Sequence, residues 1–246
     1  MLKSKIVKHQ EKVIGILGGM GPESTAALFL KIIRATPALK DQDHLRIIID
    51  NNPKIPSRVQ AISGKGESPL KQLQETLHTL ERAGAEIIAI PCNTAHHYYR
   101  ELQESTNVPI INMISETAAY IHNSFPNIKK TGLLATTGTI KAGIYHQALT
   151  KLEIITPDVS EQEIVMNAIY VGQGIKAGYT QGKPRDDILE VAKALINRGA
   201  EAIIVGCTEV SLVLTQEDLP VPLIDALQVL AAVAVRKARQ LRATNL

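Results

Sequence analysis

The chain has 246 residues, of which 45% are apolar and 21% charged, and its formal net charge is +3. This length exceeds that of a marginal small domain and suits one large or two medium α/β domains. No apolar run reaches the roughly 18 residues of a membrane span. The weak charge and 3% aromatic content argue against a nucleic-acid surface. The polar start, residues 1–12, lacks the apolar core of a signal peptide, so we expect a cytoplasmic location.

Short apolar runs alternate with amphipathic segments along the chain. Continuous Ile and Val runs are typical of strands buried on both faces, as in a parallel sheet. A proline favours the start of one helix, and a glycine marks the end of another. The expected strands are 13–17, 46–49, 86–90 and 108–112, and the expected helices are 22–35, 69–83 and a segment after residue 112.

The second part of the chain repeats the pattern of the first. The segment 83–92 is similar to 198–207, and both segments end in cysteine. The Val-Pro-Ile sequence at 108–110 recurs as Val-Pro-Leu at 221–223, and the strand and small-residue loop at 13–22 recur at 131–139. Three landmarks in one order indicate two similar α/β halves with parallel sheets, related by a pseudo-twofold axis.

We expect these halves to have definite limits in the sequence. The N-terminal half is expected at 1–113 and the C-terminal half at 114–224. A final helix, at about 225–246, is expected either to stay with the second half or to pack back onto the first. The active site is expected in the cleft between the halves, because ligands of open α/β sheets bind at the carboxyl ends of the strands.

The two cysteines, Cys92 and Cys207, follow predicted strands at equivalent places in the repeat. A thiol at the N-terminus of a following helix has a lowered pKa. A pseudo-twofold axis would bring both sulfur atoms to one cleft. Racemisation needs such a pair, because one group removes the α-proton while a second delivers a proton to the opposite face. For either cysteine alone, a small buried apolar residue is the alternative.

Other residues near these strand ends leave alternatives open. The glycine-rich turn at 18–22 either brings backbone N–H groups close to an anion or is a plain tight turn. It matches a dinucleotide-binding fingerprint poorly, because Ser24 stands where that motif needs glycine. His96, four residues after Cys92, suggests a zinc site, but no known zinc motif supports it. Glu209 is expected to orient a substrate ammonium, to shape the pKa of Cys207 or to cap a helix.

In these segments the chain resembles the aspartate/glutamate racemase superfamily, most closely its aspartate racemase branch. The matching segments are 14–22, 51–58, 91–96, 132–139 and 206–209. The resemblance implies two similar α/β domains around one site, Cys92 and Cys207 as the catalytic pair, and a homodimer. The glutamate racemase branch usually has an Asp-Ser pair after the first strand and a histidine after the second Cys-Thr. This chain instead has Gly19-Met20 and Glu209 there.

The resemblance also implies a set of substrate-binding residues. Arg58 and Lys176 match basic residues beside the side-chain carboxylate of the substrate, with solvated basic side chains as the alternative. The residues expected around the α-carboxylate and ammonium are Asn93, Thr94, Thr136, Thr139 and Thr208. The remaining positions expected in the site are Gly19, Met20, Asn52 and Glu209. No metal ligand is expected.

The sequence therefore predicts an aspartate racemase that acts on a small amino acid by two-base proton transfer, without cofactor. One alternative is a broad-specificity amino-acid racemase of the same branch. Another is a non-catalytic protein that binds amino acids or dicarboxylates in the same cleft. A nucleotide-binding oxidoreductase is favoured only by the glycine-rich turn.

Overall fold

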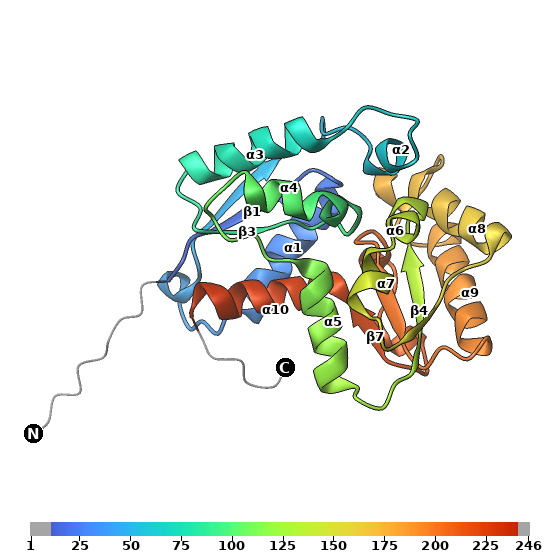
Figure 1. The fold of residues 1–246 in the computed structure, drawn as a ribbon. Coiled ribbons are helices and arrows are strands. Elements are labelled where there is room, and N and C mark those ends of the chain that lie inside the picture. The colour runs from blue at the N-terminus through green and yellow to red at the C-terminus, as the bar shows by residue number, and fades with distance from the viewer. Residues whose placement is uncertain (1–10, 241–246) are drawn as a thin grey trace, which may run out of the picture.

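Parallel strands form two separate sheets, one from each half of the chain, in the computed structural model, which describes residues 11–240 (Figure 1). The first sheet has the order β2-β1-β3, and the second has the order β5-β4-β6-β7. The fold class expected from the sequence is confirmed. The strands are β1 Ile14–Gly18, β2 Ile47–Asn51, β3 Ile87–Ala89, β4 Lys130–Ala135, β5 Glu153–Ile155, β6 Ile203–Gly206 and β7 Leu223–Asp225.

The repeat seen in the sequence reappears in the pairing of the strands. In the second half β7 pairs with β6 through Leu223 and Ile203, and in the first half the corresponding contact is a single bridge between Ile110 and Ile88. The fourth strand expected at 108–112 is therefore only a bridge. The N–H of Ile111 still donates to the carbonyl oxygen of Ile88, but the N–H of Met113, two residues on, bonds to the His96 ring at 3.1 Å rather than extending the ladder.

Helices flank both sheets (Figure 1). The helices before β4 are α1 Pro22–Ala35, α2 Arg58–Ile62, α3 Leu70–Arg82, α4 Tyr99–Glu104 and α5 Met113–Ser124. Those after it are α6 Thr137–Ala142, α7 Ile144–Ala148, α8 Val159–Tyr170, α9 Lys183–Asn197 and α10 Ala226–Ala238. The short 3-10 turns are η1 Asp41–Asp43, η2 Thr94–Tyr98, η3 Ile175–Ala177, η4 Val210–Leu212 and η5 Gln216–Asp218.

Local sequence features account for several helix ends. Pro22 occupies the first turn of α1, where its missing N–H is not needed. The side chains of Asn112 and Asp225 accept hydrogen bonds from the first backbone N–H groups of α5 and α10. Gly84 follows α3 with a φ of 93°, a conformation that favours glycine.

The last helix of the described chain returns to the first sheet. α10 begins at the end of β7 and runs back beside α1 (Figure 1). Its buried Leu230 and Val233 share one apolar core with Ile14 and Ile16 of β1. Residues 239–240 of the expected final helix form a turn, and its residues 241–246, like residues 1–10, lie outside the described residues. No helix within 11–240 is both long and apolar enough to cross a membrane.

The position of α10 in this core predicts its contribution to stability. Leu230→Ala removes a fully buried side chain between α10 and the first sheet and should lower the free energy of unfolding by about 2–5 kcal/mol. The matched control is Gln228→Ala on the exposed face of the same helix, which should change it by about 0.5 kcal/mol or less. Urea denaturation followed by circular dichroism measures both, and equal losses would contradict this assignment of the core.

Candidate active site

The carboxyl ends of β3 and β6 lead into the two cysteines. Cys92 follows β3 closely and Cys207 follows β6 directly, and the two side chains are 6% and 4% exposed. Both line one small cavity, of about 10 Å³, between the two halves of the chain. The fold thus brings two thiols, far apart in the sequence, to the wall of a single small chamber.

Three threonine hydroxyls form a cluster at this chamber. Thr94 Oγ1 lies 3.0 Å from Thr136 Oγ1 and 2.8 Å from Thr139 Oγ1, and the last two hydroxyls are 3.1 Å apart. Thr136 also caps α6 by accepting a hydrogen bond from the N–H of Thr139. Thr94 and Thr136 line the chamber, whereas Thr139 reaches it only through their hydroxyls. Such hydroxyls suit a carboxylate, because each can donate to it.

Asn93 places an unpaired donor at the same chamber. Its Oδ1 accepts a hydrogen bond of 2.6 Å from the hydroxyl of Tyr145, while its buried Nδ2 has no partner. Burial raises the pKa of the Tyr145 hydroxyl far above its usual range, so Tyr145 stays a neutral donor. Because Tyr145 fixes the oxygen of Asn93, the amide nitrogen remains available for an anion. The sequence analysis missed Tyr145, whose place in the short helix α7 carries no local signal.

Glu209 joins the second thiol to a lysine. The Cys207 thiol donates to Glu209 Oε2 at 3.1 Å, and Lys176 forms an ion pair with Glu209 Oε1. Burial raises the pKa of the Cys207 thiol well above its usual range, the charge of Glu209 raises it further, and Lys176 opposes both effects.

The expectation of a lowered thiol pKa is therefore wrong for Cys207. A lowered value requires an exposed, electropositive helix N-terminus. Cys207 is instead buried, precedes only the three-residue turn η4 and donates to a carboxylate. Glu209 makes no side-chain capping bond to that turn, so of its three expected roles the cap is not seen.

Arg58 carries a charge without a carboxylate partner among the described residues. Its Nη1 donates to the carbonyl oxygens of Ile55 and Pro56 at 3.1 and 2.9 Å, and its buried Nε has no partner. Arg58 lines the chamber and is half-buried rather than a solvated loop residue. A partly desolvated guanidinium of this kind is suited to bind an anion.

The remaining expected residues divide into two groups. Met20 and Thr208 line the chamber, and the Thr208 hydroxyl donates to the carbonyl oxygen of Pro91 across the halves at 3.3 Å. Gly19 lines only an outer cavity, and its N–H donates to Thr25 Oγ1 rather than pointing at a ligand. Asn52 lies outside the two site cavities and donates to the Thr76 hydroxyl at 3.0 Å.

Gly19 and Asn52 nevertheless constrain each other. Gly19 has a φ of 94°, and a Cβ at this position would lie 2.2 Å from the backbone carbon of Asn52. The close approach of these two loops shapes the outer cavity. This outer cavity measures about 260 Å³ and is also lined by Arg58, Lys176 and the ring of Tyr170. Tyr170, at the end of α8, is a second residue that the sequence analysis did not identify.

His96 supports the backbone instead of pointing to a zinc site. Its Nδ1 lies 2.9 Å from the carbonyl oxygen of Cys92, and its Nε2 accepts from the N–H of Met113. Burial lowers the pKa of the His96 imidazole, which is consistent with a neutral ring held between backbone groups. Within residues 11–240, no group of three or more His, Cys, Asp or Glu residues is arranged to hold a metal.

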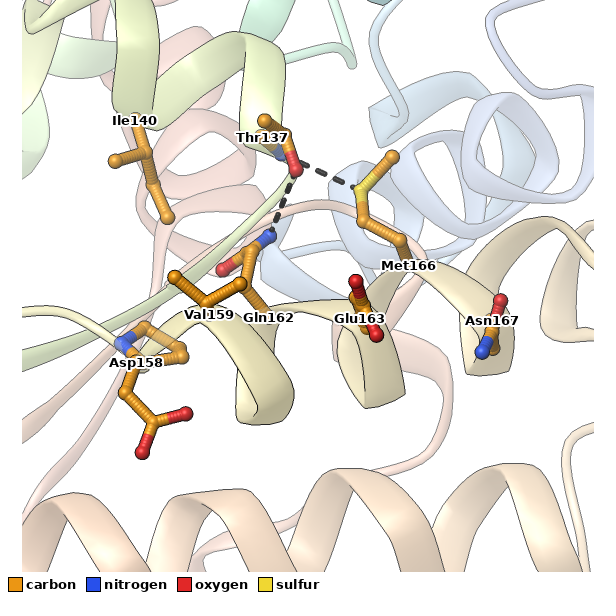
Figure 2. A pocket seen from close by; sticks show the side chains of 9 residues that line it. Thr137, Ile140, Asp158, Val159, Gln162, Glu163, Met166 and Asn167 are labelled. Carbon is orange, nitrogen blue, oxygen red and sulfur yellow. Dashed lines mark hydrogen bonds between the residues drawn. The ribbon is translucent and has the colours of Figure 1, made fainter.

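A larger cavity, of about 580 Å³, lies between α6 and α8, as Figure 2 shows. Its lining includes the apolar side chains of Ile140, Val159 and Met166, and neither cysteine reaches it. The amide of Gln162 donates to the Thr137 hydroxyl at 3.3 Å across this space. The smaller, charged chamber between the thiols is therefore the better candidate for the active site.

Comparisons with known proteins point to one enzyme family. The family model for Asp/Glu/hydantoin racemases matches residues 17–234. The broad-specificity amino-acid racemase RacX of Bacillus subtilis is 30% identical over 225 residues, which cover 89% of this chain and 95% of that protein.

Solved structures show the same likeness. The Picrophilus torridus aspartate racemase superposes with a TM-score of 0.83 at 33% identity, over 92% of this chain and 94% of that chain. A putative Asp/Glu racemase from Yersinia pestis has a TM-score of 0.74 at 29% identity, over 92% and 99%. A Francisella tularensis glutamate racemase, at 20% identity and a TM-score of 0.64 over 96% and 85%, is similar in fold alone.

The contact between Cys207 and Glu209 predicts how this thiol titrates. In a Cys92→Ser background, where Cys207 is the one remaining thiol of the chain, its alkylation by iodoacetamide should rise only at a pH above that of an ordinary cysteine. Glu209→Gln removes the charge that adds to the effect of burial on the Cys207 pKa, so the midpoint of the profile should move to lower pH. Glu217→Gln, on the surface, is the control. A midpoint that stays in place or rises would contradict the assigned cause.

Proposed function

The chain belongs to the Asp/Glu/hydantoin racemase family, and on this premise we propose that it is a cofactor-independent aspartate racemase with Cys92 and Cys207 as its acid–base pair. The strongest support is the position of two buried thiols, from equivalent strand ends, on one small chamber. A single thiol would serve many reactions, whereas an opposed pair suits transfer of a proton between two faces of one carbon.

The proposed reaction conserves charge in the site. The thiolate of one cysteine removes the α-proton and becomes a thiol, and the electron pair stays on the substrate as a carbanion conjugated with the α-carboxylate. The thiol of the other cysteine then donates its proton to the opposite face and becomes a thiolate. The hydroxyls of Thr94 and Thr136 and the unpaired Nδ2 of Asn93 would stabilise the carboxylate as its charge increases.

Arg58 supports a substrate with a second carboxylate. Its buried Nε lacks a partner, and it lines both the chamber and the outer cavity. Lys176 lines both cavities as well and brings a second positive charge. We therefore assign Arg58 and Lys176 to the side-chain carboxylate of aspartate, because a desolvated anion needs such partners.

A broad-specificity amino-acid racemase is the second candidate. One observation favours it: Lys176 already has a carboxylate partner in Glu209, so Arg58 alone is uncommitted. The Bacillus subtilis relative is named as a racemase of broad specificity. Relative turnover of aspartate and uncharged amino acids decides between the two candidates.

The proposal extends to assembly and location. We propose that each chain consists of halves at 1–113 and 114–224, with α10 added to the first half. We further propose that two such chains form a homodimer in the cytoplasm. Sedimentation velocity of the purified protein tests the dimer, and cell fractionation tests the location.

The two-thiol mechanism predicts the fate of deuterium. In heavy water, L-aspartate should give D-aspartate labelled at the α-carbon, while the remaining L-aspartate stays mostly unlabelled at early times. Cys92→Ala and Cys207→Ala should each reduce racemisation by about 10²–10⁴-fold or more, because every turnover needs both groups. Each variant should retain slow exchange of one isomer only. NMR and chiral chromatography follow both pools, and near wild-type racemisation by either variant would refute the mechanism.

The assignment of Arg58 predicts a change in substrate preference. Arg58→Ala should reduce kcat/KM for aspartate by about 10-fold or more, since an ionic contact to a desolvated carboxylate is lost. Any turnover of alanine should change much less, because alanine has no side-chain carboxylate. Arg100→Ala, at an exposed ion pair on α4, is the control. Equal losses for aspartate and alanine would show that Arg58 does not read the second carboxylate.

A further inference from the structure

Five residues line both the thiol chamber and the outer cavity and form the wall between them. The residues that line both spaces are Met20, Arg58, Tyr170, Lys176 and Glu209. The chamber, at about 10 Å³, has room for about one water molecule, whereas the outer cavity measures about 260 Å³. An amino acid in the outer cavity therefore reaches the thiols only if this shared wall rearranges.

The ion pair of Lys176 and Glu209 is the charged contact in that wall. Both residues come from the second half, but the pair lies over the glycine-rich turn of the first. Lys176 Nζ also donates to the carbonyl oxygen of Met20 at 3.3 Å. A Cβ on Gly21 would lie 3.3 Å from Glu209 Oε1 and 3.4 Å from Lys176 Nζ. The pair thus connects the two halves at the entrance to the chamber.

Glu209 is held more firmly than Lys176. Its side chain is 5% exposed, and Ser24, Cys207 and Thr208 all lie within hydrogen-bonding distance of its oxygens, at 3.4, 3.1 and 3.4 Å. The Lys176 side chain is 22% exposed and has the Met20 carbonyl and the Tyr170 ring, 5.5 Å away, as its other contacts. When the pair opens, Glu209 keeps its place beside Cys207 and Lys176 is the member that moves.

Opening the pair leaves the Glu209 carboxylate and the Lys176 ammonium without an oppositely charged partner in a partly buried site, which is costly. A dicarboxylate without an ammonium restores a partner to Lys176 but leaves Glu209 facing a second anion. An amino acid without a side-chain carboxylate satisfies Glu209 and leaves Lys176. A dicarboxylic amino acid supplies both charges, so it replaces both halves of the broken pair.

We propose that the Lys176–Glu209 ion pair is a charge-exchange gate that admits dicarboxylic amino acids. Lys176 transfers from Glu209 to the side-chain carboxylate, and Glu209 then binds the α-ammonium. Because Glu209 stays in contact with the Cys207 thiol, this places the α-carbon next to that sulfur. The gate rests on the proposed function for the identity of its ligand, but it is a statement about binding selectivity and does not depend on turnover.

Equilibrium binding to the intact protein tests the gate. The ligands are DL-aspartate, succinate, which lacks the ammonium, and L-alanine, which lacks the side-chain carboxylate. Racemic aspartate is used so that racemisation produces no net heat in calorimetry. Glu209→Gln frees Lys176 and removes the carboxylate that repels the second carboxylate of succinate. Succinate should therefore bind about 10-fold more tightly to this variant than to the wild type. The ratio of aspartate affinity to succinate affinity should fall by at least about 10-fold.

Lys176→Met provides the mirror-image measurement. It should lower the ratio of aspartate affinity to alanine affinity, because only aspartate loses a partner. Asp218→Asn is the matched control, because it breaks an ion pair with Arg185 in the same half of the chain. The Arg185 side chain is 29% exposed and that of Asp218 is 13% exposed. It should leave both ratios unchanged. Thermal melting establishes that each variant is folded.

The outcomes separate the gate from the proposed function. Tighter succinate binding and a lower ratio of aspartate to succinate affinity in Glu209→Gln support the gate, even if the wild type racemises no amino acid, in which case only the proposed function fails. Racemisation of aspartate together with unchanged ratios in both variants overturns the gate and leaves the function in place. A parallel loss of both ligands in Glu209→Gln also overturns the gate, because a purely structural role predicts that result.

Discussion

The packing of α10 against the first sheet fixes how the two halves face each other. α10 starts at Asp225, the last residue of β7, and its apolar face completes a core with β1, β3 and α1. Asp225 reinforces this junction by capping α10, accepting from Ser211 and pairing with Lys31 of α1 at 3.0 Å. At the other end of α10, Arg236 and Lys237 pair with Glu116 of α5. A rigid junction matters here because two thiols on different halves share one small chamber.

The chamber imposes opposing electrostatic demands on its residues. Burial favours the neutral form of a thiol, and the neighbouring Glu209 strengthens that preference at Cys207. Proton abstraction needs a thiolate, which positive charge close to the sulfur favours. Two cations, Lys176 and Arg58, line the chamber. Lys176 pairs with Glu209, whereas Arg58 has no carboxylate partner among the described residues. The charges that we propose to bind an anionic ligand therefore also affect the protonation of the thiol.

Sequence alone gave the repeated α/β halves, their parallel sheets and the family, because these depend on apolar periodicity and on landmarks that recur in order. It singled out Cys92, Cys207 and several threonines because they lie near predicted strand ends, and the structure brings both cysteines to one chamber. It did not identify Tyr145 or Tyr170, since each reaches the site by a helix whose local pattern is ordinary. The direction in which the Cys207 pKa is shifted could not be predicted from the sequence either. That direction depends on burial and on the orientation of Glu209, and neither is set by spacing along the chain.

The segment that carries Lys176 is anchored more tightly than its glycines suggest. Ile175, the neighbour of Lys176, is fully buried in the core of the second half, and the short turn η3 holds its backbone. A displacement of the whole segment would expose that side chain to water, which opposes segmental motion. Rotation of the lysine side chain carries no such penalty. Side-chain rotation at exposed positions takes picoseconds to nanoseconds, and loop motions take nanoseconds to microseconds. Opening of the proposed gate therefore costs the broken ion pair but leaves the backbone of this segment in place.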